Sequence, residues 1–187
     1  MTALSDNLLL ERIQQGDIES FEALFSRHYD RVYGLLYRLV GNRAEAEDLA
    51  QEVFIKLYKH TAARRGLFRL NRQQNIGAWL YRVATNAGYD ALKMRKRRWQ
   101  RDTLLLPDPA GAPGAEQTVA ALEEKARVRA ALARLPKRQA QLLLMRQMEF
   151  SYAECAAACE VAPGSVGTLL SRAAAAFRKE YESIANN

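Results

Sequence analysis

Apolar residues recur at spacings of three and four along nearly the whole chain, and strict alternation of apolar and polar residues is not sustained. The clearest stripe runs from Phe21 to Leu39. It lies between Asp17, a residue suited to cap a helix, and Gly41, a residue suited to end one. Such spacing gathers apolar side chains on one helix face, where a core can bury them together. The pattern therefore predicts an all-α protein.

Caps and helix-ending residues divide the chain into expected helices over 6–15, 18–40, 43–60, 76–98, 118–135, 136–148, 151–159 and 163–183. Asn42, Asn75 and Ser151 stand where N-caps are expected. Pro136 and Pro163 fall at first-turn positions, where a missing N–H is tolerated. Residues 61–75 have no sustained period and are expected to form a basic loop.

The composition changes between Trp99 and Gln117, where LPDPAGAPGAEQ is rich in Pro, Gly and Ala. Such a composition is typical of a flexible linker. We expect two helical domains, over residues 1–98 and 119–187, joined by a flexible linker over 99–118. In the second domain a short helix, a tight turn at 160–162 and a longer helix have the spacing of a helix-turn-helix.

The chain is basic, with 28 Lys and Arg against 21 Asp and Glu, a formal net charge of +7 and a pI near 9.6. Nucleic acids are the commonest polyanions in cytoplasm, so a nucleic acid is the expected partner and a membrane surface is the rival. One predicted helix ends in the basic run Lys93, Arg95, Lys96, Arg97 and Arg98. This helix lacks the large outward apolar face that binding at a membrane surface needs.

Groups that could carry catalysis or hold a metal are scarce. Cys155 and Cys159 offer two metal ligands at most and cannot build a disulfide framework. His28 lies on an apolar stripe without a second ligand at metal spacing, so it is expected to be a packed or half-exposed residue and not a metal ligand. No catalytic triad, carboxylate pair or Gly-rich phosphate loop can be assembled, and no long apolar segment occurs. We expect a cytoplasmic protein that is not an enzyme and has no metal, cofactor or membrane insertion.

The predicted helix 43–60 carries an acidic face on this otherwise basic protein. At ~100° per residue, Glu45, Asp48 and Glu52 fall within a narrow arc with Gln51 beside them. A carboxylate face kept clear of the core is either merely solvated or pairs with basic side chains of a partner.

The sequence resembles a known family in both domains. Resemblance to region two of bacterial sigma factors lies in FEALFSRHYDRVYGLLYRLVGN, RAEAEDLAQEVFIKLYKH and WLYRVATNAGYDALKMRKRR. Resemblance to region four lies in ALARLPKRQAQLLLMRQMEFSYAECAAACEVAPGSVGTLLSRA. With only these two regions and a short linker, the chain resembles an extracytoplasmic-function sigma factor of the sigma-70 family.

The resemblance implies a protein that binds core RNA polymerase, directs it to promoters and helps to melt the DNA. In the family, the polar residues of a DLxQE pattern contact the polymerase, and they correspond to Asp48, Gln51 and Glu52. Residues 61–75 correspond to the loop that captures a flipped base. An anti-sigma protein that holds the two domains is a further partner that the family implies.

The resemblance also assigns the promoter contacts. The minus-ten element, as duplex and as melted strand, is expected against the helix 76–98 through Arg82, Asn86, Lys93, Arg95, Lys96 and Arg97. The minus-thirty-five element is expected in contact with Ser165, Thr168, Ser171 and Arg172. Asp90 lies near the apolar side of its helix, so a salt link to Lys93 or a nearby Arg is expected.

The chain departs from the family pattern in its helix-turn-helix. Glu160 stands where the turn usually has Gly, and Cys155 and Cys159 stand at apolar core positions. Basic residues of the family pattern are replaced at Gly167, Leu169 and Ala174. We therefore expect weak reading of the minus-thirty-five element. A helix-turn-helix regulator acting without polymerase, and a basic helical protein that binds RNA or a membrane surface, are the alternative functions.

Overall fold

The computed structural model describes residues 4–62, 75–101 and 119–186, and every regular element within these ranges is helical. The N-terminal half forms α1 (Asp6–Gln14), α2 (Ile18–Val40), α3 (Arg43–Ala62) and α4 (Ile76–Arg101). The C-terminal half forms α5 (Val119–Arg134), α6 (Lys137–Gln147), α7 (Tyr152–Cys159), the 3-10 turn η1 (Pro163–Ser165) and α8 (Val166–Ala185). The all-α prediction is confirmed.

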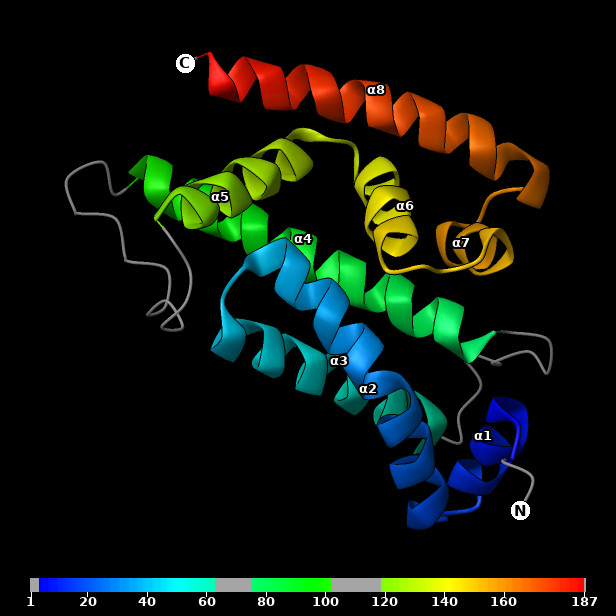
Figure 1. Cartoon of the computed structure of the whole chain (residues 1–187). Helices are drawn as coiled ribbons and strands as arrows, with labels where there is room; N and C mark the ends of the chain where they lie inside the picture. The colour runs from blue at the N-terminus through cyan, green and yellow to red at the C-terminus, as the bar shows by residue number, and fades with distance from the viewer. Residues whose placement is uncertain (1–3, 63–74, 102–118, 187) are drawn as a thin grey trace.

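Helix α4 runs through the middle of the molecule (Figure 1). It contacts α2 and α3 of its own half and α5, α6 and α7 of the other half. Helix α8 packs on α5 and α6, and it lies across the top of the view in Figure 1. The buried apolar residues of both halves consequently form one continuous cluster.

Four helices begin directly after the N-cap residues that the sequence predicts. Each of the four predicted N-caps accepts a hydrogen bond from the backbone N–H three residues later: Asp17, Asn42, Asn75 and Ser151. At the start of α7, Glu154 completes a capping box with Ser151. Gly41 ends α2 at a φ of 72°, in the left-handed region that residues with a Cβ rarely adopt.

Helix α2 supplies much of the core of the N-terminal half, with Leu24, Leu35 and Leu39 completely buried. His28 lies on the same face and is also buried. Its Nε2 lies 2.8 Å from a carboxylate oxygen of Asp6 in α1, and its Nδ1 lies 3.3 Å from the hydroxyl of Tyr81 in α4. Of the two alternatives predicted for His28, packed or half-exposed, the structure shows the packed one.

Helix α4 is buried on more of its surface than its apolar stripe predicts. Ile76 and Leu80, two apolar residues of that stripe, are buried, but Tyr81 and Tyr89 are buried as well. The C-terminal half covers these two tyrosines: the ring of Tyr81 contacts Phe150, and the hydroxyl of Tyr89 donates a hydrogen bond to the backbone of α5. One apolar stripe predicts one buried face, whereas α4 is buried against both halves of the chain.

Several boundaries differ from the prediction. Helix α4 continues through residues 99–101, which the sequence assigns to the linker, because residues 89–101 contain no Gly or Pro that would break the helix. Pro136 stands at the N-cap of α6 instead of inside its first turn, and Pro163 begins the turn η1, so α8 starts only at Val166. The remainder of the predicted loop, 63–74, and of the linker, 102–118, lies outside the described residues.

The expectation for Asp90 was wrong. Its side chain is 67% exposed, and its partner is Lys137 of α6 at 3.5 Å, not Lys93 or a nearby Arg. Asp90 lies at the rim of the contact between α4 and α6, where its carboxylate stays hydrated and does not need the buried partner that the sequence suggested.

Candidate polymerase and nucleic-acid interfaces

The first candidate surface is the outward face of α3. Asp48, Gln51 and Glu52 are exposed, and their side chains form no ion pair or hydrogen bond with any other residue that the structure describes. The opposite face is completely buried through Ala46, Ala50, Val53 and Leu57. Ile55, one turn after Gln51 and 51% exposed, adds an apolar side chain that the sequence reading did not single out. This face can therefore engage another molecule without disturbing the core.

Glu45, the remaining member of the acidic arc, is engaged within the protein. Its carboxylate forms an ion pair with Arg95, and Arg95 also donates a hydrogen bond to the backbone carbonyl of Val40 at 3.1 Å. Arg95 thus ties the C-terminal part of α4 to the junction between α2 and α3. The sequence could not reveal this structural use, because these residues are about fifty positions apart. A phosphate contact by Arg95 stays a prediction.

The second candidate surface is on α4, and the structure separates its predicted members. Asn86 and Lys93 are exposed, whereas Arg82 is half-buried and forms an ion pair with Glu160 at the end of α7. Lys96 and Arg97 belong to the last turns of α4, and their side chains lie outside the described part of the chain. Arg82 is therefore placed beside the helix-turn-helix.

The third candidate surface is the N-terminal part of α8, which follows α7 and η1 in the predicted helix-turn-helix. All the predicted reading residues here are exposed: Ser165 at the end of η1, and Thr168, Ser171 and Arg172 in α8. Val166 and Ala173 point into the core instead. The Oγ of Ser171 donates a hydrogen bond to the carbonyl of Gly167 at 3.1 Å, so this hydroxyl has only acceptor capacity left for a base edge.

The cysteines of α7 are packed inside the helix-turn-helix. Cys155 and Cys159 are both buried, and burial raises the pKa of the Cys159 thiol to about 12. Burial also raises the pKa of the Cys155 thiol. Both sulfurs therefore stay protonated near neutral pH and pack as small apolar groups, which confirms the prediction that they are core residues. Within the described ranges, no group of three or more His, Cys, Asp and Glu residues could hold a metal ion.

The turn of the helix-turn-helix contains a strained residue. Glu160 has a φ of 53°, in the left-handed region, and its N–H closes α7 by bonding to the carbonyl of Ala156. A non-glycine residue in this region costs on the order of 1 kcal/mol or more. The expectation that Glu160 occupies a glycine-like position is confirmed, and its carboxylate is directed at Arg82.

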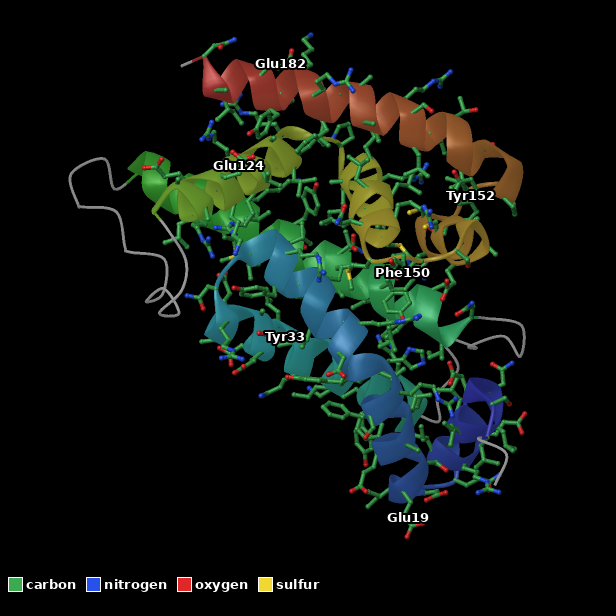
Figure 2. All side chains as sticks on the ribbon, viewed as in Figure 1. Glu19, Tyr33, Glu124, Phe150, Tyr152 and Glu182 are labelled. Atoms are coloured by element: carbon green, nitrogen blue, oxygen red, sulfur yellow. The ribbon has the colours of Figure 1, made fainter. Side chains whose placement is uncertain are left out.

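The contact between the two halves was missed by the sequence reading. Phe150, labelled in Figure 2, precedes α7. It packs edge-on against Tyr81 with ring centroids 4.5 Å apart. The guanidinium of Arg31 lies over the same phenyl ring at 5.0 Å and pairs with Glu154 at 3.4 Å. The sequence feature that could have indicated this contact is the pair Tyr81 and Tyr89, which lie about two turns apart on one face of α4.

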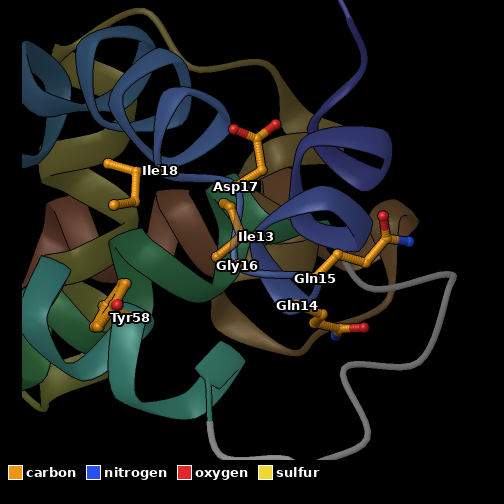
Figure 3. A pocket seen from close by; sticks show the side chains of 7 residues that line it. All are labelled: Ile13, Gln14, Gln15, Gly16, Asp17, Ile18 and Tyr58. Atoms are coloured by element: carbon orange, nitrogen blue, oxygen red, sulfur yellow. The ribbon is translucent and has the colours of Figure 1, made fainter.

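A hollow of about 240 Å³ lies beside the turn between α1 and α2 (Figure 3). Its lining consists of Ile13, Gln14, Gln15, Gly16, Asp17, Ile18 and Tyr58. The carboxylate of Asp17 accepts hydrogen bonds from the backbone N–H and the hydroxyl of Ser20. None of the described helices has the length and apolarity needed to cross a bilayer.

Two protein-family models match the sequence of this chain. Sigma-70 region 2 matches residues 24–98, and Sigma-70, region 4 matches residues 125–177. Among curated proteins, the ECF RNA polymerase sigma factor SigW of Bacillus subtilis (strain 168) is 28% identical, over 94% of this chain and 96% of that protein. The RNA polymerase sigma-H factor of Pseudomonas aeruginosa is 29% identical, over 98% of this chain and 97% of that protein.

Solved structures show a similar fold. CnrH, in complex with the cytosolic domain of CnrY, has a TM-score of 0.62 at 18% identity, covering 95% of this chain and 97% of CnrH. The sigma factor RpoE, in complex with the anti-sigma factor NepR from Bartonella quintana, has a TM-score of 0.56 at 23% identity, covering 88% of this chain and 98% of the matched one.

Proposed function

Because this chain belongs to the sigma-70 family of RNA polymerase sigma factors, in its extracytoplasmic-function group, we propose that the outward face of α3 is its polymerase-binding surface. The observation that carries this proposal is the exposure of Asp48, Gln51 and Glu52 without partners among the described residues. Such a face can pair with basic side chains of a larger protein, and Ile55 can add apolar contact at its edge.

Promoter DNA is assigned to α4 and α8. On α4, the amide of Asn86 can hydrogen-bond to a base edge, while Lys93, Lys96 and Arg97 can neutralise phosphates near the end of the helix. On α8, Arg172 can bind a guanine through two hydrogen bonds, and Ser165, Thr168 and Ser171 are less selective readers. This division gives α4 the minus-ten element and α8 the minus-thirty-five element.

An anti-sigma protein is a further proposed partner. The support is that RpoE, whose fold is similar to this one, was solved in complex with the anti-sigma factor NepR. Such a partner would bind the two halves together and keep them from polymerase and DNA.

Competition for core RNA polymerase tests the proposal. A variant with Asp48→Ala, Gln51→Ala and Glu52→Ala should compete at least tenfold less well against a reference sigma factor, because desolvated charge pairs contribute about 1.5 kcal/mol or more each. Its circular dichroism should match the wild type, since these side chains face away from the core. Run-off transcription from a promoter that the wild type uses should fall in parallel.

A matched control separates loss of the interface from loss of charge. Glu22→Ala, Gln147→Ala and Glu182→Ala remove the same two carboxylates and one amide from other exposed positions. This control should compete like the wild type. Equal competition by both variants would refute the α3 assignment, and promoter binding by the protein without any polymerase effect would favour an independent helix-turn-helix regulator.

A further inference from the structure

We infer that Glu160 is an intramolecular competitor of promoter DNA: its carboxylate holds the guanidinium of Arg82 and thereby keeps the C-terminal half docked on α4. The inference rests on the proposed function in one respect, the assignment of α4 to promoter DNA, within which the family resemblance places Arg82. It concerns an interaction surface inside the chain, between α4 on one side and α6 and α7 on the other.

The docked surface has the build of an interface between domains. Its centre is apolar, with Phe150 and Tyr81 both buried and in edge-to-face contact. Charged pairs lie around this centre: Arg82 with Glu160, Arg31 with Glu154, and Lys137 with Asp90. A small apolar centre with a polar rim is typical of interfaces that open and close.

The position of Glu160 indicates more than packing. A residue that must adopt a positive φ is most cheaply Gly, and a Glu there is strained. In this strained conformation, the carboxylate of Glu160 forms an ion pair with Arg82 across the contact between the two halves. The side chain of Glu160 is 63% exposed and that of Arg82 is 32% exposed, so water and other anions can reach the pair and replace the carboxylate.

Competition follows from the chemistry of the guanidinium. The Nη1 group of Arg82 that binds the Glu160 carboxylate is one of the N–H groups that could bind a DNA phosphate. Arg82 cannot serve both anions with the same N–H groups, and α7 lies against α4 while Glu160 holds it. We call molecules closed when the C-terminal half is docked on α4, and open when it is not. Because only open molecules expose Arg82 fully, the apparent affinity of the free protein for DNA falls in proportion to the open fraction.

Closure can be measured without DNA or polymerase. Spin or fluorescent labels on Lys59→Cys in α3 and Arg178→Cys in α8 report the distance between the halves, and the native cysteines are buried. Glu160→Gln, which keeps the size of the side chain, should raise the open fraction about two- to fivefold, as expected for loss of a partly exposed ion pair. Glu160→Gly should do the same while relieving the strain.

The chain offers a matched control. Glu149 is exposed and also has a positive φ, 63°, but it forms no ion pair with another described residue. Glu149→Gly and Glu149→Gln make the same changes in charge and strain, and they should leave the distance distribution unchanged. The charge exchange Arg82→Glu with Glu160→Arg should restore closure.

DNA binding supplies the second readout. The probe is a short fluorescein-labelled duplex of random sequence, titrated by anisotropy at fixed salt concentration. The Glu160 variants should bind it about two- to fivefold more tightly than the Glu149 variants, following the open fraction.

Each outcome decides the inference. If the Glu160 variants open no more than the Glu149 variants, Glu160 does not hold the halves together and the inference is wrong. If they open but bind the duplex no better, competition is refuted and Arg82 is not a DNA contact. Run-off transcription by the α3 variant described above is independent of both readouts, so failure of the proposed function would be recognised separately.

Discussion

The hydroxyl of Tyr89 in α4 donates a 2.8 Å hydrogen bond to the backbone carbonyl of Leu132 in α5, across the boundary between the two halves of the chain. The phenol is buried, and this burial raises its pKa, so it stays a neutral donor at physiological pH. Because the hydrogen bond is buried, water does not compete for it, and it helps to fix α5 relative to α4.

Replacing Tyr89 with Phe should therefore lower the free energy of unfolding by about 1 kcal/mol, since the buried carbonyl of Leu132 loses the phenol donor and keeps only the N–H of Leu135. Urea denaturation measures the change. Tyr152→Phe is the control, because Tyr152 is 49% exposed on α7, and it should change the unfolding free energy by less than about 0.5 kcal/mol. Equal effects of the two substitutions would show that the hydrogen bond adds nothing to stability.

The capping box of α7 predicts a pH dependence of stability. Burial acts to raise the pKa of Glu154, but hydrogen bonds from Ser151 and the charge of Arg31 outweigh it and lower the pKa below the ordinary value of 4.5. A carboxyl whose pKa is lowered by folding stabilises the protein above its unfolded pKa, and this contribution is lost as the pH falls through the folded pKa. Thermal unfolding between about pH 6 and pH 3 should show a smaller loss of stability in Glu154→Gln than in the wild type. The Glu149→Gln variant should follow the wild type, and a Glu154→Gln profile parallel to it would contradict the assignment.

The two cations near the end of α4 should differ in their effects. Lys93 is exposed, so Lys93→Gln should reduce the slope of log K against log salt by about 0.9 for binding of polymerase holoenzyme to promoter DNA. Arg95 is held by Glu45 and the carbonyl of Val40. Arg95→Gln should therefore lower the melting temperature more than Lys93→Gln does, and it should change the slope less than Lys93→Gln does. The reverse ranking would show that Arg95 leaves Glu45 to bind phosphate.

The recognition helix should read its element weakly and chiefly through Arg172. Arg172→Ala should reduce discrimination by about 1–3 kcal/mol, because it removes the guanidinium that can bind a guanine at two atoms. Ser171→Ala should cost less, since the Ser171 hydroxyl already donates to Gly167. Transcription from a promoter series provides the measurement. If scrambling the minus-thirty-five element stops initiation as fully as scrambling the minus-ten element, α8 is a strong reader and the prediction fails.

The candidate surfaces were predictable from the sequence to different extents. Helical spacing alone placed Asp48, Gln51 and Glu52 on a face opposite the core, since residues on one helix have a fixed angular relation. It could not separate Glu45, which is also on that arc, because its partner Arg95 belongs to another helix. It could not place Arg82 either, since the ion pair with Glu160 joins residues 78 positions apart.

The sequence by itself determined the helices and four of their N-caps, because these depend on neighbours within about one turn. The resemblance to region four supplied the expectations for the cysteine core of α7 and the turn at Glu160. Only the tertiary structure decided that α4 has a second buried face, that Asp90 pairs with Lys137, and that Phe150 packs on Tyr81. These contacts join separate helices, and their pairing depends on how the two halves dock. Local spacing of residues carries no information on that docking, because the same exposed polar and aromatic side chains are compatible with solvent, with a partner or with each other.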